Sequence, residues 1–299
     1  MTLRRLTPAF SFFRKCIWGA VAALIIVGAD ALTPASYAAA AAPAIRTAGA
    51  HGATMVPDFS GVWMRMNPVT FLPVPGDELG RPVERLPLEG VDAPEIMAGN
   101  FDNPILQPWA REIVQTNAES EINLEHVHTS DDTCWPLGVP QILNLREPVQ
   151  FLQAEDIIVI IYQRDHQVRR IPLNQGHSVN GAKSWYGDSV GHYEGDTLVV
   201  DTIHQLTHKM SVVDNYGTPH TSLIQVVERY RPISDELGAG IEVRFRVDDL
   251  GAFTMGWTGL IVYRPSPTPF SEVVCAENNR DFAPGSVFGE VPEDKDPAF

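Results

Sequence analysis

The sequence predicts a mainly β protein, in which an antiparallel meander closes into a barrel after an irregular, proline-rich N-terminal half that contains one helix. Short apolar or alternating runs recur through the second half of the chain, with turn residues between them. The spacing of these runs leaves no room for βαβ units, so neighbouring strands are expected to be antiparallel.

The N-terminus predicts export. Residues 1–38 combine a basic start at Arg4 and Arg5, an apolar run over 16–28 and a small-residue cleavage site at Ser36 to Ala38. The apolar run has about a dozen residues, whereas a helix that spans a bilayer needs about 20. We therefore expect a cleaved signal peptide, no stable membrane span after cleavage, and a periplasmic or secreted protein.

Composition indicates one folded, acidic domain. A hydrophobic fraction of 44% excludes a disordered chain. The 22 Lys+Arg against 37 Asp+Glu give a net charge of -15, which excludes a nucleic-acid partner because a phosphate backbone repels an acidic protein. We expect a flexible Ala-, Pro- and Gly-rich linker over 39–57, one β-rich domain over 58–282, and an acidic, proline-containing tail over 283–299.

The cysteines predict one disulfide. Cys16 leaves with the signal peptide, so Cys134 and Cys275 remain in a compartment where disulfides persist. The alternative is a catalytic thiol, which an oxidising compartment and an even cysteine count disfavour.

The secondary structure is predicted from pattern and turn residues. Residues 108–124 read as a helix, because a proline stands at the start and acidic and apolar residues alternate at helical spacing. Gly195 can take the positive φ of a tight turn and marks a hairpin. Strands are expected over 156–163, 167–171, 189–193, 197–203, 222–231, 240–248, 256–264 and 272–275.

Alternation along the strands predicts which side chains face the core. The clearest inward set is Ile241, Val243, Phe245 and Val247. Glu228 shares a face with Val226 and Tyr230, and Asp201 shares one with Val199 and Ile203. A carboxylate among apolar neighbours must be paired or have a raised pKa, and Arg169, Arg170 and Arg229 are the candidate partners for pairing.

The hairpin carries a recognisable motif, which runs from Trp185 through Asp188-Ser189 and Glu194-Gly195-Asp196 to Thr202. It resembles a family of exported bacterial proteins, mostly uncharacterised, that share a W-x-G-D-S-x-G-x-Y/W-E-G-D-T-L-V-V-D-T hairpin. The likeness extends to the stretches 58–63, 134–140 and 272–279, and it implies no particular activity. His192 departs from the family, which usually has Arg or Lys there.

A second resemblance starts from Gly61-Val62-Trp63, which is similar to the Gly-x-Trp of lipocalin and calycin barrels. In those barrels the tryptophan closes one end and packs on an arginine from a late strand, so Arg264 is the expected partner. Together with the meander pattern, this resemblance favours a calycin-like barrel over a sandwich.

Histidines and carboxylates near the hairpin suggest acid-base chemistry, because a histidine whose tautomer a carboxylate fixes can transfer protons near neutral pH. The candidate catalytic residues are His177, Asp188, His192, Asp201, His220 and Glu228. The candidate ligand-binding residues are Arg169, Arg170, Trp185, Tyr186 and Trp257. Surface pairing and turn capping are the structural alternatives for these residues.

Metal and cofactor signals are weak. His126 and His128 would share one face of a strand, but no recognised spacing supplies a third ligand. The chain has no Walker loop, dinucleotide fingerprint, Gly-x-Ser-x-Gly elbow or His-Glu-x-x-His, so no cofactor is expected.

Three functions fit this inventory. The first is an exported barrel enzyme that acts on a small, largely apolar molecule by cofactor-free general acid-base chemistry, as an isomerase, lyase, hydratase or hydrolase, in the barrel mouth. The second is a non-catalytic, lipocalin-like carrier of an apolar ligand. The third is a metal-dependent hydrolase that uses His126 and His128.

Overall fold

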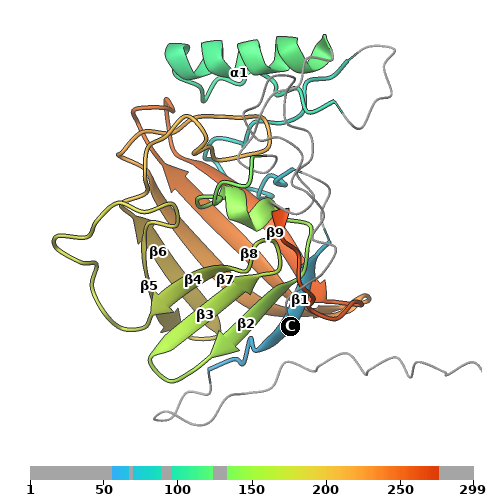
Figure 1. Cartoon of the computed structure of the whole chain (residues 1–299), viewed down its shortest axis with the longest axis vertical. Coiled ribbons are helices and arrows are strands. Elements are labelled where there is room, and N and C mark those ends of the chain that lie inside the picture. Colours follow the sequence, from blue (N-terminus) through green and yellow to red (C-terminus); the bar gives the residue numbers. More distant parts are fainter. Residues whose placement is uncertain (1–55, 67–69, 89–95, 124–132, 276–299) are drawn as a thin grey trace, which may run out of the picture. The chain divides into compact units, whose positions relative to one another are not determined.

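The computed structural model describes residues 56–66, 70–88, 96–123 and 133–275. The predicted signal peptide, most of the predicted linker and the acidic tail lie outside these ranges. Nine strands form one antiparallel sheet in the order β4-β3-β2-β1-β9-β8-β7-β6-β5, which curves into a nearly closed barrel (Figure 1). The predicted mainly β barrel is thereby confirmed.

The strands are β1 (Gly61–Arg65), β2 (Val149–Gln153), β3 (Ile157–Tyr162), β4 (Gln167–Pro172), β5 (Asp188–Glu194), β6 (Thr197–Ile203), β7 (Gln225–Asp235), β8 (Gly238–Asp248) and β9 (Trp257–Pro265). Seven of the predicted strands are confirmed, from β3 to β9. The strand expected over 272–275 is wrong, since Val273 makes only an isolated bridge to Arg164. The sequence pattern missed β1 and β2. Each has only five residues and borders the irregular, proline-rich part of the chain.

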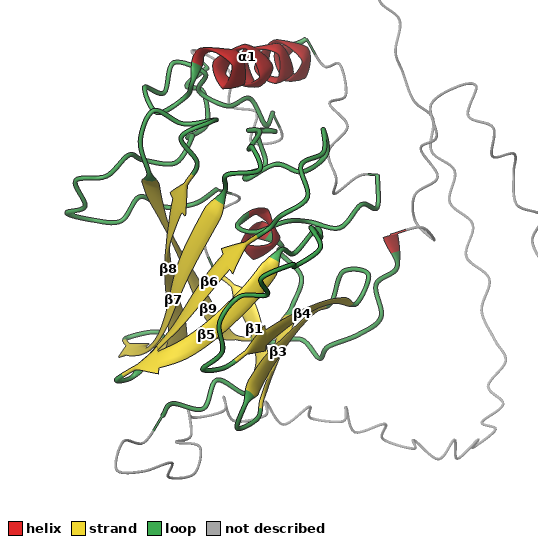
Figure 2. Cartoon of the chain, turned by 90° about the vertical axis from the view of Figure 1, so that its left-hand side faces the viewer, coloured by secondary structure: helices red, strands yellow, loops and turns green. Residues whose placement is uncertain are grey.

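Helix α1 (Pro108–Ile122) confirms the predicted helix. A proline occupies its first turn, and Ala110, Val114 and Ala118 form its buried stripe. Both views place α1 beyond one end of the strands (Figures 1 and 2). There the Trp109 indole donates a hydrogen bond to the Gly251 carbonyl in the β8–β9 connection, 2.8 Å away. Among the residues that the model describes, no helix is both long and apolar enough to cross a membrane.

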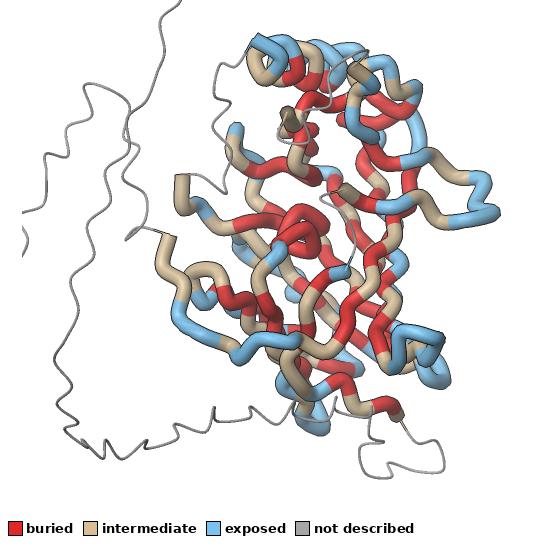
Figure 3. Tube along the Cα trace, turned by 90° about the vertical axis from the view of Figure 1, so that its right-hand side faces the viewer, coloured by how far each residue is buried: buried red, intermediate tan, exposed pale blue. Residues whose placement is uncertain are grey.

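The barrel interior is filled with side chains. Buried residues recur at alternate positions along the strands (Figure 3), and the predicted inward set on β8 is confirmed. Aromatic rings pack closely inside: Phe71 lies 4.6 Å from Phe245, and Phe151 lies 5.9 Å from Tyr230, between ring centroids. An apolar ligand in the centre of this barrel would have to displace core side chains.

A buried ion pair crosses the same interior. Arg169 on β4 and Glu228 on β7 have side chains only 1% and 0% exposed, and they form a bidentate pair. The structure thus pairs Glu228 with one of its expected partners. Burial alone would lower the pKa of Arg169, but the adjacent Glu228 carboxylate raises it.

The expected contact between Trp63 and Arg264 is wrong. Residues directly opposite on paired strands project to the same face, and Arg264 is opposite Met64, whereas Trp63 is opposite Pro265. Trp63 therefore points into the core, while Arg264 lies on the other face and bonds to Asp235.

The predicted disulfide is present. Cys134 and Cys275 are joined across 141 residues, with a Cα–Cα distance of 5.6 Å. The bond ties the segment after β9 to the irregular segment before β2, where few ladder hydrogen bonds hold the chain.

Candidate functional site

The barrel seam lies between β4 and β5. No ladder joins these strands; the contact is a single bridge between Leu173 and Gly191, where the Asn174 amide donates to the Gly191 carbonyl at 2.7 Å. Arg169 reaches across the seam from inside. Its Nε donates to Ser189 Oγ on β5 at 3.1 Å, and one terminal nitrogen donates to Thr202 Oγ1 on β6 at 2.7 Å. The seam is thus held mainly by side chains.

The β4–β5 connection places His177 between two carboxylates. Its Nδ1 lies 3.4 Å from Asp188 Oδ2, and its Nε2 lies 3.2 Å from Asp201 Oδ2. These are contacts at ion-pair distance, at angles that do not make hydrogen bonds. The His177 side chain is 20% exposed, but both of its ring nitrogens are buried, so the exposed part consists of carbon atoms. Three of the six candidate catalytic residues therefore meet at one place.

Neighbouring residues hold both carboxylates in position. Asp188 accepts a hydrogen bond from the Ser178 amide at 2.7 Å, and Asp201 accepts two from Gln225 Nε2, at 2.9 and 3.0 Å. The arrangement places one imidazole nitrogen near each carboxylate, and the ring must turn to form hydrogen bonds before it can take part in proton transfer. It lies on the outer face of β5 and β6, because Ser189 and Thr202, the residues next to the two carboxylates, point inward. The expected position in the barrel mouth is therefore wrong.

The other candidate catalytic residues lie elsewhere. His192 is exposed on β5 and pairs with Glu194 at 3.2 Å. Glu228 is sealed inside the barrel with Arg169, where it contacts no solvent. Strand parity indicated that Glu228 faces inward, but parity alone does not show how far a side chain is from an opening.

His220 forms a separate, buried group. Its Nε2 lies 2.8 Å from Ser211 Oγ, and its Nδ1 lies 2.9 Å from the Thr221 carbonyl oxygen. Burial lowers the pKa of His220, so the neutral imidazole is favoured. Asp249 accepts hydrogen bonds from the Thr221 amide and hydroxyl, at 2.5 and 2.6 Å. These contacts satisfy the polar atoms of a packed loop; Ser211 is itself buried.

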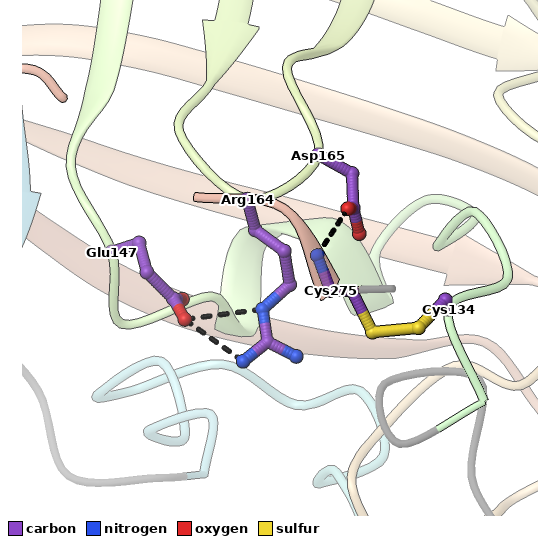
Figure 4. Close-up of a disulfide and its surroundings, with 5 residues drawn as sticks. All are labelled: Cys134, Glu147, Arg164, Asp165 and Cys275. Carbon is purple, nitrogen blue, oxygen red and sulfur yellow. Dashed lines mark hydrogen bonds and ion pairs between the residues drawn. A yellow bond between two sulfur atoms is a disulfide. The ribbon is translucent and has the colours of Figure 1, made fainter. Parts of the chain in front are cut away.

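A pocket of about 320 Å³ lies beside the disulfide. The apolar part of the lining consists of Trp135, Pro136, Val168 and Tyr186. The polar part consists of Asp165, His166 and Gln167. Figure 4 shows Asp165 next to Cys275, whose amide donates to its carboxylate at 2.7 Å. The disulfide therefore forms part of the wall and fixes the segment that carries Trp135.

The polar side of this pocket is organised by Gln167. Its Oε1 accepts hydrogen bonds from the Leu137 amide and the Tyr186 hydroxyl, both at 3.1 Å. Within the described residues its Nε2 has no hydrogen-bond partner, so it remains available as a donor. Burial, with a smaller effect of Asp165, raises the pKa of Tyr186 to about 12, so this phenol stays protonated at neutral pH.

Aromatic rings extend from the pocket across its rim. Trp135, Trp185 and His208 lie 5.4 Å from one another, between ring centroids. Trp135 is 46% exposed, which is high for a tryptophan in such a cluster. Tyr186, among the candidate ligand-binding residues, lines the pocket itself, and Trp185 lies at the rim.

Three candidate ligand-binding residues do not reach this pocket's wall. Arg169 is buried in its ion pair, Arg170 is exposed on the outer face of β4, and Trp257 packs in the core against Phe245 and Phe253. Trp257 belongs to the inward series of β9, so a core position follows from strand parity.

Sequence reasoning did not name Trp135, Gln167 or Gln225 as site residues. Trp135 had a detectable signal, because it directly follows a disulfide cysteine within the stretch 134–140. Gln167 and Gln225 each begin a strand, and nothing in the local pattern distinguishes them from ordinary strand ends.

Across the four described ranges, no group of three His, Cys, Asp or Glu side chains could hold a metal ion. His126 and His128 lie outside those ranges. Comparison of the chain with protein-family models, curated proteins and solved structures gives no match.

Proposed function

We propose that this chain is an exported β-barrel protein that binds a small, largely apolar molecule in the pocket between Trp135 and Tyr186. The observation that carries the proposal is the aromatic-walled pocket of about 320 Å³ with one free donor, Gln167 Nε2. Pockets of this kind combine apolar walls with a few polar groups that orient the ligand. The disulfide supports export, since such bonds persist in oxidising compartments.

The pocket also suggests the ligand's chemistry. A planar or cyclic carbon skeleton would stack on Trp135 and Tyr186, and an acceptor oxygen would meet Gln167 Nε2. The filled barrel interior leaves this rim, rather than the lumen, as the binding place. The resemblance to exported proteins that share the hairpin motif is consistent with this proposal, although it implies no ligand.

Replacing Trp135 with alanine tests the pocket directly. We expect the affinity for a fluorescent ring compound such as 1-aminoanthracene to fall about tenfold, equivalent to about 1.4 kcal/mol, because one wall of the pocket is lost. The matched control is Trp109→Ala, since Trp109 is similarly exposed at 40% but lies on α1. Fluorescence titration measures both variants. Equal affinities in the two variants would rule out the Trp135 pocket.

A second function, acid-base catalysis, is favoured by one observation, the position of His177 between Asp188 and Asp201. An imidazole can both donate and accept protons near neutral pH, and the flanking carboxylates would orient it. In this case the bound molecule would be a substrate, converted without a cofactor by isomerisation, elimination, hydration or hydrolysis.

His177→Asn tests this second function. The mature protein is incubated with an extract of small molecules, and compound loss is followed by liquid chromatography and mass spectrometry. Wild type and His192→Asn are expected to consume the same compound, because His192 is exposed and pairs with Glu194 rather than with Asp188 or Asp201, while His177→Asn loses at least 100-fold in rate. No consumption by wild type, or consumption that His177→Asn retains, leaves only the binding function.

A further inference from the structure

A cluster of arginines lies on the outer face of β7 and β8. Arg229 and Arg231 alternate with inward residues on β7, and Arg244 does so on β8. Their side chains are about half exposed, so the guanidinium groups stand at the surface of the sheet. Such a concentration of positive charge is unexpected on a protein whose net charge is -15.

The strand register brings two of these charges together. Arg229 is directly opposite Arg244 in the β7–β8 ladder. Like charges at directly opposite positions destabilise a sheet. A carboxylate at position 229 or 244 would stabilise the sheet better. The neighbouring pair has this arrangement, because Arg231 is opposite Glu242.

Two carboxylates hold the three guanidinium groups in place. Glu242 Oε1 accepts from Arg231 at 3.0 Å and from Arg244 Nε at 2.9 Å, and Glu194 accepts from Arg229. Burial alone would raise the pKa of Glu242, but hydrogen bonds from Arg244 and Arg231 lower it, so the carboxylate stays charged. Three positive groups against two negative ones leave an excess of one positive charge.

The three arginines and Glu242 border a hollow of about 270 Å³, which Thr197 completes. Each guanidinium carries five N–H donors, and each arginine here uses only one nitrogen on a carboxylate. From this geometry we propose that the hollow is an anion site that binds a phosphate group. A tetrahedral phosphate offers enough oxygens to meet three guanidinium groups together, whereas a carboxylate has only two.

Titration calorimetry of the mature protein with inorganic phosphate tests the site. We expect saturable binding by wild type and at least a tenfold weaker affinity in Arg244→Gln. The matched control is Arg246→Gln, because Arg246 lies two residues after Arg244 on β8, bonds to Asp248 and does not border the hollow. This control should bind within twofold of wild type, and thermal unfolding confirms that both variants are folded.

Further measurements distinguish free phosphate from a lipid phosphate as the ligand and show whether the site binds phosphate at all. Sedimentation with phosphatidylglycerol vesicles, and with phosphatidylcholine vesicles as the uncharged reference, shows whether a lipid phosphate is bound as well as the free ion. No phosphate binding by wild type, or equal binding by wild type and Arg244→Gln, overturns the proposal. Neither result bears on the Trp135 pocket, so the two proposals fail independently.

Discussion

Replacing Glu228 with glutamine is expected to destabilise the barrel by about 3–5 kcal/mol, because it leaves the Arg169 guanidinium buried without a counter-charge. The side chain keeps its size, so the loss reports on the charge and on the hydrogen bonds to Arg169 rather than on packing. Urea unfolding at neutral pH, followed by far-ultraviolet circular dichroism, measures the change as a lower midpoint.

Two further variants distinguish this explanation from a general loss of structure. Asp248→Asn breaks the exposed pair with Arg246 and should cost at most about 1 kcal/mol. The double variant Arg169→Met with Glu228→Leu removes both charges and should recover part of the stability lost in Glu228→Gln. An unfolding midpoint of Glu228→Gln equal to that of wild type contradicts the role given to this pair.

The ion pair also affects the outer face. Arg169 binds Ser189 and Thr202, which directly follow Asp188 and Asp201 in sequence. Adjacent residues of a strand point to opposite faces, so the inner contact fixes the strands that carry the outer carboxylates. Glu228→Gln should therefore lower the stability of the fold and also any catalytic rate that depends on His177.

Removing the disulfide, by Cys134→Ser with Cys275→Ser, is expected to cost about 3–5 kcal/mol, since the closed loop of 141 residues limits the unfolded chain. Thermal unfolding of wild type with and without reductant measures the same loss. The same change should weaken binding at Trp135, because Cys134 and its neighbour form the pocket wall.

The double variant supplies its own control, since reductant should not alter its unfolding further. If wild type and the double variant unfold at the same temperature without reductant, the bond contributes no stability. If ring-compound binding is unchanged while stability falls, the disulfide stabilises the fold without shaping the pocket.

The strands of the second half could be predicted because their patterns are regular. In β8 apolar and charged residues alternate without a break, and Gly195 marks a tight turn between β5 and β6. By contrast, β1 and β2 are short and gain their stability from pairing with each other and with β9 and β3, which are distant in sequence. Local pattern contains no information on such non-local pairing.

The candidate site could be predicted only in part. His177, Asp188 and Asp201 were named as residues near the hairpin and do meet, because β5 and β6 pair as the predicted hairpin. Glu228 and Trp257 were assigned to a site, yet both are core residues. The pocket at Trp135 depends on the disulfide, which the cysteine count predicted, and on the contact between Leu137 and Gln167, which no local pattern reveals.

Native mass spectrometry of the protein purified from its native host, with and without a chelator, tests the proposed binding function most directly. We expect a retained small molecule of low polarity that is unaffected by the chelator, present in wild type and Trp109→Ala, and strongly reduced in Trp135→Ala. A retained molecule at the wild-type level in Trp135→Ala would contradict the proposed pocket, as would a wild-type protein that carries only a metal ion.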